Sequence, residues 1–445
     1  MDTPPIEYTA QAASPIVNGE VKMTIGENSL TASALLDTAE IPFVKMDTLE
    51  YANHNITVRT EKEEYVFSRM GNWAQPFFDA LCEAYNKAVL RAFFISGNHI
   101  LATTGDYRFI EGGIVFSGSK VPIRVYENCV VTLPPNTYAR RIPLCFVNKI
   151  DKGEHELTLK LNTGESYTFS KMGYDTVPFT EAVEKNIRAL REKSIAAVNN
   201  IDPSLSIAQA SQIAKLMPEG AAVPMGQLAA IAPSFASYVD AKMAQTRAAD
   251  SYALFKEICD ATQIRIGFMK NSIGWRKADN SAEAADSSID DAVPSDPYLF
   301  WIIAPAPNDQ YCAVEFAVQS DEHVATFVFR TNGNFQTSAE NINRAMEAIS
   351  FKREVIRLAD RELKAPNYID YYMAAKRTAS LQYVRTSFVG RVIHSNPESW
   401  KRRLVEMGVD GTTKKPNTPK KRLCSWCGIE LPEDAEHCEG CGMKF

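Results

Sequence analysis

Residues 65–71 read YVFSRMG, and residues 167–173, 102 positions later, read YTFSKMG. Each copy ends an alternating stretch, ITVRTEKEEYVFS or LTLKLNTGESYTFS, in which apolar residues recur at every second position around a turn. This pattern predicts a β-hairpin. Further upstream, within 20–45 and 119–144, both copies carry EN and then IP followed by an apolar residue. The repeat is therefore much longer than the seven residues that reveal it.

A helix is predicted to follow each copy. Pro76 and Pro178 each lie five residues after the final glycine, and proline is favoured in the first turn of a helix. Apolar residues then recur at helical spacing: Phe77, Leu81, Ala84, Tyr85 and Ala88 in the first copy, and Phe179, Ala182, Val183, Ile187 and Leu190 in the second. Each unit is thus expected to be several strands followed by one amphipathic helix.

The repeated phrase has two interpretations. Ser68 and Ser170, or Arg69 and Lys171, could form a duplicated site; alternatively, the aromatic residues face the core and the glycine allows the turn into the helix. A weaker third copy, FVFRTNG at 327–333, keeps the aromatics and the glycine but lacks the serine, which favours packing. In that copy Ser338 is expected to cap the following helix.

Strands followed by a single C-terminal helix resemble the pleckstrin-homology-like (PH-like) domain, over roughly 19–95, 118–195 and 255–360. The resemblance implies an α+β protein made of small antiparallel β-barrel units, each closed by a helix, that bind peptides, lipids or partner domains. Lipid-binding members need several basic residues in the first hairpin. The turns here, TIGENSL and RVYENCV, hold one arginine and two glutamates. Protein is therefore the expected partner, and inositol lipid is not.

The chain divides into seven predicted segments. A connector rich in alanine and glutamine is expected to form short helices interrupted at Pro218, Pro224 and Pro233. In order, the segments are a flexible N-terminus (1–18), PH-like repeat 1 (19–96), PH-like repeat 2 (97–200), the helical connector (201–253), a degenerate third PH-like unit (254–365) with an acidic loop (277–297), a helix and basic tether (366–423) and a zinc ribbon (424–445).

The last 22 residues strongly resemble a zinc ribbon. Two CxxC pairs lie ten residues apart, a spacing that brings four thiolates around one tetrahedral ion. The predicted ligands are Cys424, Cys427, Cys438 and Cys441. With all four positions taken by cysteine, the single Zn²⁺ is expected to be structural, and so short a segment folds only when it binds the metal. Four free thiols or two disulfides are the alternatives, and His437 could act as a substitute ligand or lie in solvent.

The segment before the ribbon is basic. Residues 401–423 contain eight lysines and arginines against two acidic residues, a net charge of +6, whereas 424–445 carry −4. A flexible basic segment can contact the phosphates of nucleic acid, or it can be a solvated linker.

Composition limits the remaining possibilities. The 445 residues carry a net charge of −6, and no apolar run is long enough to cross a membrane. The N-terminus lacks the basic start and apolar core of a signal peptide. Five of the nine cysteines are isolated in apolar surroundings, which is typical of a reducing compartment. We therefore expect a cytoplasmic protein.

No catalytic motif with its structural context is present: there is no HExxH, no GxSxG and no dinucleotide-binding fingerprint. The sequence predicts a non-enzymatic adaptor that binds protein partners through its PH-like units. The alternative is a nucleic-acid-associated, transcription-related factor that uses the tether 401–423.

Overall fold

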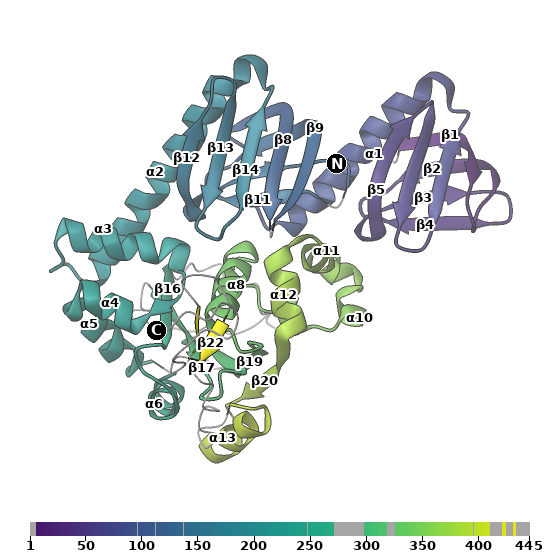
Figure 1. Cartoon of the computed structure of the whole chain (residues 1–445). Helices are drawn as coiled ribbons and strands as arrows, with labels where there is room; N and C mark the ends of the chain where they lie inside the picture. Colours follow the sequence, from purple (N-terminus) through teal and green to yellow (C-terminus); the bar gives the residue numbers. More distant parts are fainter. Residues whose placement is uncertain are drawn as a thin grey trace, which may run out of the picture.

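The computed structural model describes residues 6–95, 97–111, 113–136, 138–246, 248–270, 298–317, 325–394, 396–409, 421–423 and 430–432. These residues form three units of mixed α and β structure, shown in Figure 1. The expected α+β class with several antiparallel sheets is confirmed. The acidic loop 277–297 lies outside the described residues.

Unit 1 is a seven-stranded antiparallel sheet in the order β4-β3-β2-β1-β7-β6-β5, followed by a helix. Burial alternates along its strands, as the sequence pattern predicts; in β2, for example, Val21, Met23 and Ile25 are buried. The elements are β1 (Ile6–Ala13), β2 (Gly19–Ile25), β3 (Ser29–Ser33), β4 (Thr38–Pro42), η1 (Phe43–Lys45), β5 (Met46–Ala52), β6 (Asn55–Thr60), β7 (Glu64–Ser68), η2 (Gly71–Trp73) and α1 (Ala74–Ala92).

The prediction of a flexible N-terminus over 1–18 is wrong for most of that segment. Strand β1 pairs with β2 on one side and with β7 on the other, so it joins the two halves of the sheet. Its inward-facing residues include Ala10 and Ala12, which are buried but small. Alanine gives a weak strand signal, and for that reason the sequence pattern did not reveal this strand.

Unit 2 repeats the topology strand for strand, in the order β11-β10-β9-β8-β14-β13-β12. The hairpin that begins with the edge strand after the 3-10 turn carries a register shift at the same place in both units. The shift lies between Met46 and Thr48 in unit 1 and between Val147 and Lys149 in unit 2. The elements are β8 (Leu101–Glu111), β9 (Ile114–Val125), β10 (Cys129–Thr132), β11 (Arg140–Pro143), η3 (Leu144–Phe146), β12 (Val147–Lys152), β13 (Glu156–Leu161), β14 (Ser166–Ser170), η4 (Gly173–Asp175) and α2 (Thr176–Ile201).

The repeated phrase is a packing and turn element. Phe67 and Phe169 are fully buried, and the two final glycines have left-handed backbones, with φ of 56° at Gly71 and 61° at Gly173. The structural interpretation of the aromatics and glycines is thereby confirmed. The helices bury the predicted positions Phe77, Leu81, Tyr85 and Ala88, and Phe179, Val183, Ile187 and Leu190.

The methionine of the repeated phrase, Met70 or Met172, also has a structural role. Met172 is buried, and a Cβ atom at Gly105 of β8 would lie only 2.7 Å from its Cγ atom. The residue before each methionine, Arg69 or Lys171, is itself left-handed, with φ of 61° or 55°. Two left-handed residues around one buried methionine turn the chain from the last strand into the helix.

Unit 3 is built on a six-stranded antiparallel sheet whose strands follow one another in sequence order. Its strands are β15 (Val223–Pro224), β16 (Arg265–Lys270), β17 (Tyr298–Pro305), β18 (Tyr311–Ala317), β19 (Ala325–Arg330) and β20 (Phe388–Ile393). Its helical elements are α3 (Ile207–Leu216), η5 (Pro218–Gly220), α4 (Met225–Ile231), α5 (Pro233–Met243), α6 (Ala249–Ile258), α8 (Phe335–Ala348), α9 (Glu354–Arg357), α10 (Asp360–Leu363), η6 (Pro366–Tyr368), α11 (Ile369–Arg377), α12 (Ala379–Ser387) and α13 (Pro397–Glu406).

Unit 3 does not repeat the topology of units 1 and 2, so the expected third copy is not found there. Helices cover both faces of its sheet: Phe235 of α5 and Phe255 of α6 share one apolar cluster with the strands, and Ile342 of α8 and Leu381 of α12 share another. Strand β17 is accordingly buried on both faces from Leu299 to Pro305. The FVFRTNG frame marks only a strand, a turn at Gly333 (φ 78°) and a helix.

Three further expectations change in detail. Helix α8 is capped by Asn334, whose side chain accepts a hydrogen bond from the Thr337 N–H. Ser338, the predicted cap, lies inside the helix, is buried and forms a hydrogen bond with the Tyr383 hydroxyl (2.9 Å). The segment 201–253 is interrupted at the three predicted prolines, but its helices pack on the sheet of unit 3 and do not form a free connector. The basic tether is helical at its start, because α13 is anchored by buried Trp400 and Leu404.

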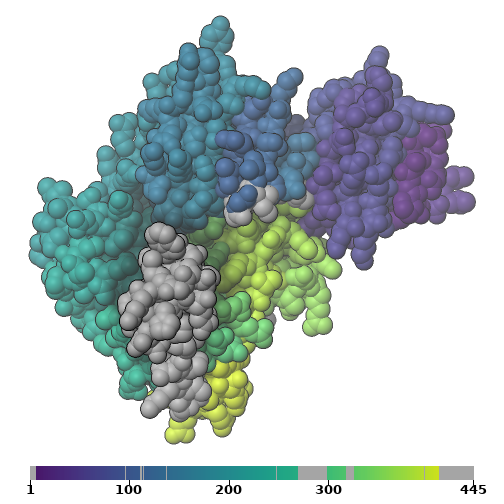
Figure 2. Space-filling view, viewed as in Figure 1, coloured from purple at the N-terminus to yellow at the C-terminus, as the bar shows by residue number. Residues whose placement is uncertain are grey.

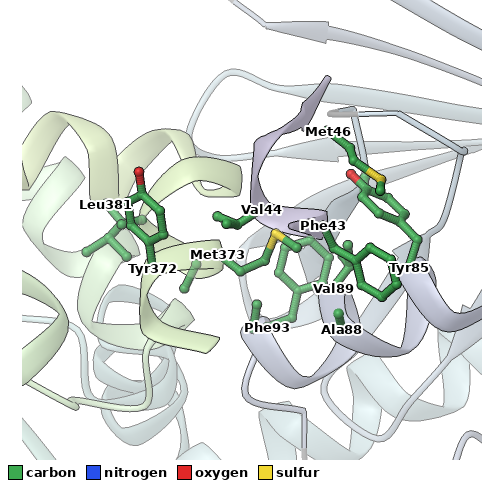
Figure 3. Packing of buried hydrophobic residues seen from close by; sticks show 14 of the residues in the cluster. Phe43, Val44, Met46, Tyr85, Ala88, Val89, Phe93, Tyr372, Met373 and Leu381 are labelled. Atoms are coloured by element: carbon green, nitrogen blue, oxygen red, sulfur yellow. The ribbon is translucent and has the colours of Figure 1, made fainter. Parts of the chain in front are cut away.

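The three units share one apolar core. It contains residues of α1 in unit 1, of β10 and the following loop in unit 2, and of α8, α11 and α12 in unit 3. Figure 3 shows Met373 of α11 reaching toward Val44 of η1 and Phe93, the residue that follows α1, while Tyr372 lies beside Leu381 of α12. The units are therefore packed against one another and are not independent modules on linkers.

Candidate protein-interaction site

The predicted zinc ligands Cys424, Cys427, Cys438 and Cys441 lie outside the described residues. Two short strands of this segment are described, β21 (Lys421–Leu423) and β22 (Glu430–Pro432), and they pair antiparallel. The first CxxC pair lies in the connection between them. Elsewhere in the described ranges, no group of three or more histidine, cysteine, aspartate or glutamate side chains could hold a metal ion.

A loop of unit 2 contacts unit 1. The loop between β10 and β11 of unit 2 lies along the edge of β5 and beside α1 of unit 1. The Leu49 N–H donates to the Pro135 carbonyl (2.9 Å), Thr48 and Asn136 form an antiparallel bridge, and the Tyr85 hydroxyl donates to the Asn136 carbonyl (3.0 Å). The sheet of unit 1 is thus extended by a piece of unit 2, as in β-augmentation.

Apolar burial supports this contact. Leu133 and Ala139, at either end of the loop, belong to the core that is shared with unit 1 and are fully buried. The loop is held from its own side by Tyr107, whose hydroxyl donates to the Tyr138 carbonyl (3.2 Å). In unit 2, this loop is a docking element.

Among the described residues, the equivalent loop of unit 1 makes no such contact. It joins β3 to β4 through residues 34–37, and its turn is closed by a hydrogen bond from the Ala34 N–H to the Asp37 carbonyl (2.8 Å). At its tip, Leu35 is 97% exposed and Leu36 is 91% exposed. Two adjacent leucines in full contact with water are unusual on a folded surface and mark an interaction site.

A groove of about 970 Å³ adjoins this loop. Its apolar wall includes Leu35, Tyr8 and Trp73, and the indole ring of Trp73 lies 6.0 Å from the Tyr8 ring while the residue stays 65% exposed. Trp73 belongs to η2, directly after the repeated phrase, so the left-handed turn positions it. Large exposed aromatics of this kind carry much of the binding energy in protein interfaces.

The rim of the groove is acidic. Glu7, Glu20 and Lys22 line it, and the Lys22 ammonium pairs with Glu7 at 2.7 Å. The three charges sum to −1, and Asp37 adds another negative charge at the loop. Unit 1 projects at one end of the molecule in Figure 2, so a partner can approach it.

The edge strand of unit 2 that corresponds to β5 of unit 1 has a different character. Strand β12 ends its sheet in the described part of the chain, but its side chains are charged: Lys152 pairs with Glu184 of α2 (2.7 Å), and Lys149 and Lys160 both pair with Asp151 (2.8 Å each). Charged edges of this kind resist pairing with another strand. The exposed leucines and the adjoining groove place the candidate site on unit 1.

The alternative interpretation of the phrase as a duplicated site is not supported by the geometry. The Ser68 hydroxyl donates to the Gln11 carbonyl of the neighbouring strand (3.2 Å), and Lys171 pairs with Asp106 (2.7 Å). Each contact stays within its own unit. Sequence reasoning missed Leu35, Leu36 and Trp73, although an apolar pair inside the predicted polar turn SALLDT was a usable signal.

The five cysteines outside the ribbon are unpaired, as predicted. Burial raises the pKa of each thiol, to about 11 for Cys129 and about 12 for Cys82, Cys259 and Cys312. The thiolate form, which is the reactive one, is therefore disfavoured at neutral pH.

No family model matches the chain, and no curated protein matches it. One similar solved structure is described as "Structure of the Spt16D Pob3N heterodimer"; it is 10% identical, covers 37% of this chain and 87% of that chain, and has a TM-score of 0.17. At that score the likeness supports no statement on function. Among the helices described, none has the length and apolarity needed to span a bilayer.

Proposed function

We propose that the chain is a non-enzymatic cytoplasmic adaptor that binds a protein partner through unit 1, at the loop 34–37 and the adjoining groove. One observation carries this proposal. The topologically equivalent loop of unit 2 is already buried in a contact between two PH-like units, whereas the loop of unit 1 presents Leu35 and Leu36 to solvent. A loop that serves as a docking element in one copy is available for docking in the other.

The chemistry of the site suggests its partner. The apolar centre formed by Leu35, Leu36 and Trp73 requires an apolar surface opposite it. The rim, whose lining charges sum to −1 and which adjoins Asp37, favours lysine or arginine around that surface. We therefore expect a protein with an apolar patch and a basic border.

The C-terminal segment is proposed to be a second, structural module. The four cysteines would hold one Zn²⁺, and the pairing of β21 with β22 around the first CxxC pair supports a ribbon-like hairpin there. The five unpaired thiols support a reducing compartment.

The alternative function, a nucleic-acid-associated factor, depends on the tether. Of that segment, 410–420 lies outside the described residues, so the alternative stays a prediction. Replacing Lys414, Lys415, Lys420, Lys421 and Arg422 by glutamine tests it, because lost phosphate contacts would flatten the salt dependence of DNA binding.

The experiment for the main proposal is quantitative affinity capture with matched variants. The double variant Leu35→Asp/Leu36→Asp should lose the partner, because it places two charges at the apolar centre, and Trp73→Ala should weaken capture. Folding should be unaffected, since all three side chains are exposed. Ile207→Asp is the control, an equally drastic change at an 85% exposed residue of unit 3. Unchanged capture by the double variant would refute the proposal, and so would equal loss in the control.

A further inference from the structure

Unit 2 exposes two large apolar side chains where its closing helix begins. Tyr174 of η4 is 104% exposed, and Val177 in the first turn of α2 is 64% exposed. The backbone between them is helical at Asp175 and Thr176, and residues three positions apart on a helix lie on the same side of it. The two side chains can therefore meet a partner together, as exposed apolar neighbours do at interaction sites.

A groove of about 570 Å³ lies beside these two side chains. It is formed by the turn between β12 and β13, by the end of β14, and by Gly173 and Thr176, which are the chain neighbours of Tyr174 and Val177. Helix α2 has 26 residues, so it spans about 39 Å, and its last turns pack with α3 of unit 3. As Figure 1 shows, the groove at the start of α2 thus belongs to the end of unit 2 that is remote from α3.

The groove carries negative charge that is available to a partner. Its charged lining consists of Glu154, Glu156 and Lys171, with His155 between the two glutamates. The Lys171 ammonium is already paired with Asp106 at 2.7 Å. Both glutamates are exposed, and neither forms an ion pair with a lysine or arginine of the described residues; Glu154 lies 3.9 Å from the ring of His155. The groove therefore favours a cationic partner.

The equivalent turn of unit 1 also presents an aromatic ring beside a groove. There Trp73 of η2 lines the groove of the candidate site. In unit 2 the ring lies one position earlier, and Asp175 takes the place of Trp73 and accepts a hydrogen bond from the Thr103 hydroxyl (2.7 Å). The two grooves are formed by different strands, yet each has two glutamates and one lysine as its lysine, arginine and acidic lining. Acidic lining and an exposed ring thus recur in both units.

We propose that this surface of unit 2 is a second docking site, which takes a basic segment of the partner that also carries apolar side chains. The apolar side chains lie on Tyr174 and Val177, and lysine or arginine pairs with Glu154 and Glu156. Together with the site on unit 1, it binds a partner with two such segments more tightly than either site alone. This bivalent use rests on the proposed function, whereas the second site does not.

Calorimetric titration of the full-length protein with the acetylated and amidated peptide KLKLK tests the second site. The parent should bind about one peptide more per chain than Tyr174→Ser/Val177→Ser, whose folding should be unaffected because both side chains are exposed. Tyr174→Phe/Val177→Ile is the matched control: it keeps the apolar surface and should bind as many peptides as the parent. If the serine variant also binds as many as the parent, or if the peptide ELELE binds as well as KLKLK, the proposal is wrong.

The variant Leu35→Asp/Leu36→Asp separates this proposal from that for unit 1. It should bind one peptide fewer than the parent, and an unchanged number would contradict the site on unit 1 while the second site stood. In this background, Glu154→Gln/Glu156→Gln should weaken binding of KLKLK about threefold or more, because two ion pairs are lost. Unweakened binding would contradict the role of the two carboxylates and overturn the proposal of a basic partner segment.

Discussion

Units 1 and 2 have the same strand order, a register shift at the same place and the same closing phrase, yet their surfaces are used differently. In unit 1 the edge strand β5 is covered by the loop 133–139 of unit 2, and the aromatic rings of Tyr51 and Phe78 lie beside it, 5.7 Å apart. In unit 2 the matching edge carries the ion pair of Lys152 with Glu184. Duplication therefore preserved the core and changed the edges.

The loop between β10 and β11 of unit 2 and the equivalent loop between β3 and β4 of unit 1 also differ. The loop of unit 2 is docked and partly buried, and the loop of unit 1 is free and exposes two leucines. The next strand shows the same contrast: Arg141 in β11 is buried against Glu347, whereas the equivalent Glu40 in β4 is exposed. Units 1 and 2 therefore differ most in the surface residues that contact another unit or that are available to a partner.

The largest expected effect concerns the common core. Phe67→Ala and Phe169→Ala should each cost about 3–5 kcal/mol in the free energy of unfolding, since both rings are fully buried. Hydrogen exchange should separate the two. Phe67 belongs to the core shared with unit 3, so its loss should also increase exchange in α11, whereas Phe169 lies in a cluster confined to unit 2.

Ser68→Ala and Ser170→Ala serve as controls and should change stability little. If exchange in α11 were unaffected by Phe67→Ala, units 1 and 3 would not unfold together. The contrast between a shared and a private core would then be lost.

The second prediction concerns the buried ion pair between Arg141 of unit 2 and Glu347 of unit 3, in place of which unit 1 has the exposed Glu40. Arg141→Met should cost about 3–5 kcal/mol, because it leaves the Glu347 carboxylate buried without its partner. The double variant Arg141→Met/Glu347→Leu should recover most of this loss, since apolar residues can replace a buried ion pair. Denaturant unfolding measures both. Glu40→Gln at the equivalent position of unit 1 should be neutral, and an equal loss there would contradict the comparison.

The third prediction weakens the docking of unit 2 on unit 1. Tyr85→Phe removes the hydrogen bond to the Asn136 carbonyl and should cost about 1 kcal/mol. Hydrogen exchange should increase at Leu49, whose N–H binds the same loop. Tyr107→Phe removes a bond to that loop from within unit 2 and should leave Leu49 protected. If both variants exposed Leu49 equally, the contact would depend on the order of the loop and not on Tyr85.

The local features of this fold could be predicted from the sequence. Hairpin alternation, the helical series after Pro76 and Pro178 and the breaks in the connector all depend on neighbours within a few residues. Strand β1 was not predicted, because its inward-facing residues include small alanines. Unit 3 was misassigned because a strand, a left-handed glycine and a helix are common to many folds, and FVFRTNG contains no more than these.

The contacts between the units could not be predicted, because they join residues that are far apart in the sequence. Arg141 and Glu347 are 206 positions apart, and the sequence around either residue does not indicate that they form a pair. The docking of the loop 133–139 on β5 likewise appears only once both units are folded. Only the paired leucines at Leu35 and Leu36, apolar in a turn, could have been recognised in advance.

The smallest expected effect concerns acid. A hydrogen bond from Lys171, and then one from the Lys120 backbone, lower the pKa of Asp106 below its ordinary 3.8. The stability from this ionised carboxylate is therefore present above pH 3.8 and lost as the pH falls through the lower, folded-state pKa. Asp106→Asn should make unit 2 slightly less stable at pH 7 and less sensitive to acid, by an amount that salt reduces. Hydrogen exchange of β14 at pH 7 and in acid measures this.

Unit 1 offers the converse test, because Gln11 takes the place of Asp106 opposite the phrase: Gln11 pairs with Ser68 as Asp106 pairs with Ser170. Gln11→Asp would set a carboxylate near Arg69, the counterpart of Lys171, and should give β7 the acid sensitivity that β14 has. If acid sensitivity stayed the same in both variants, the ion pair would contribute nothing measurable. The turn would then be stable in both units through its buried methionine and its left-handed residues alone.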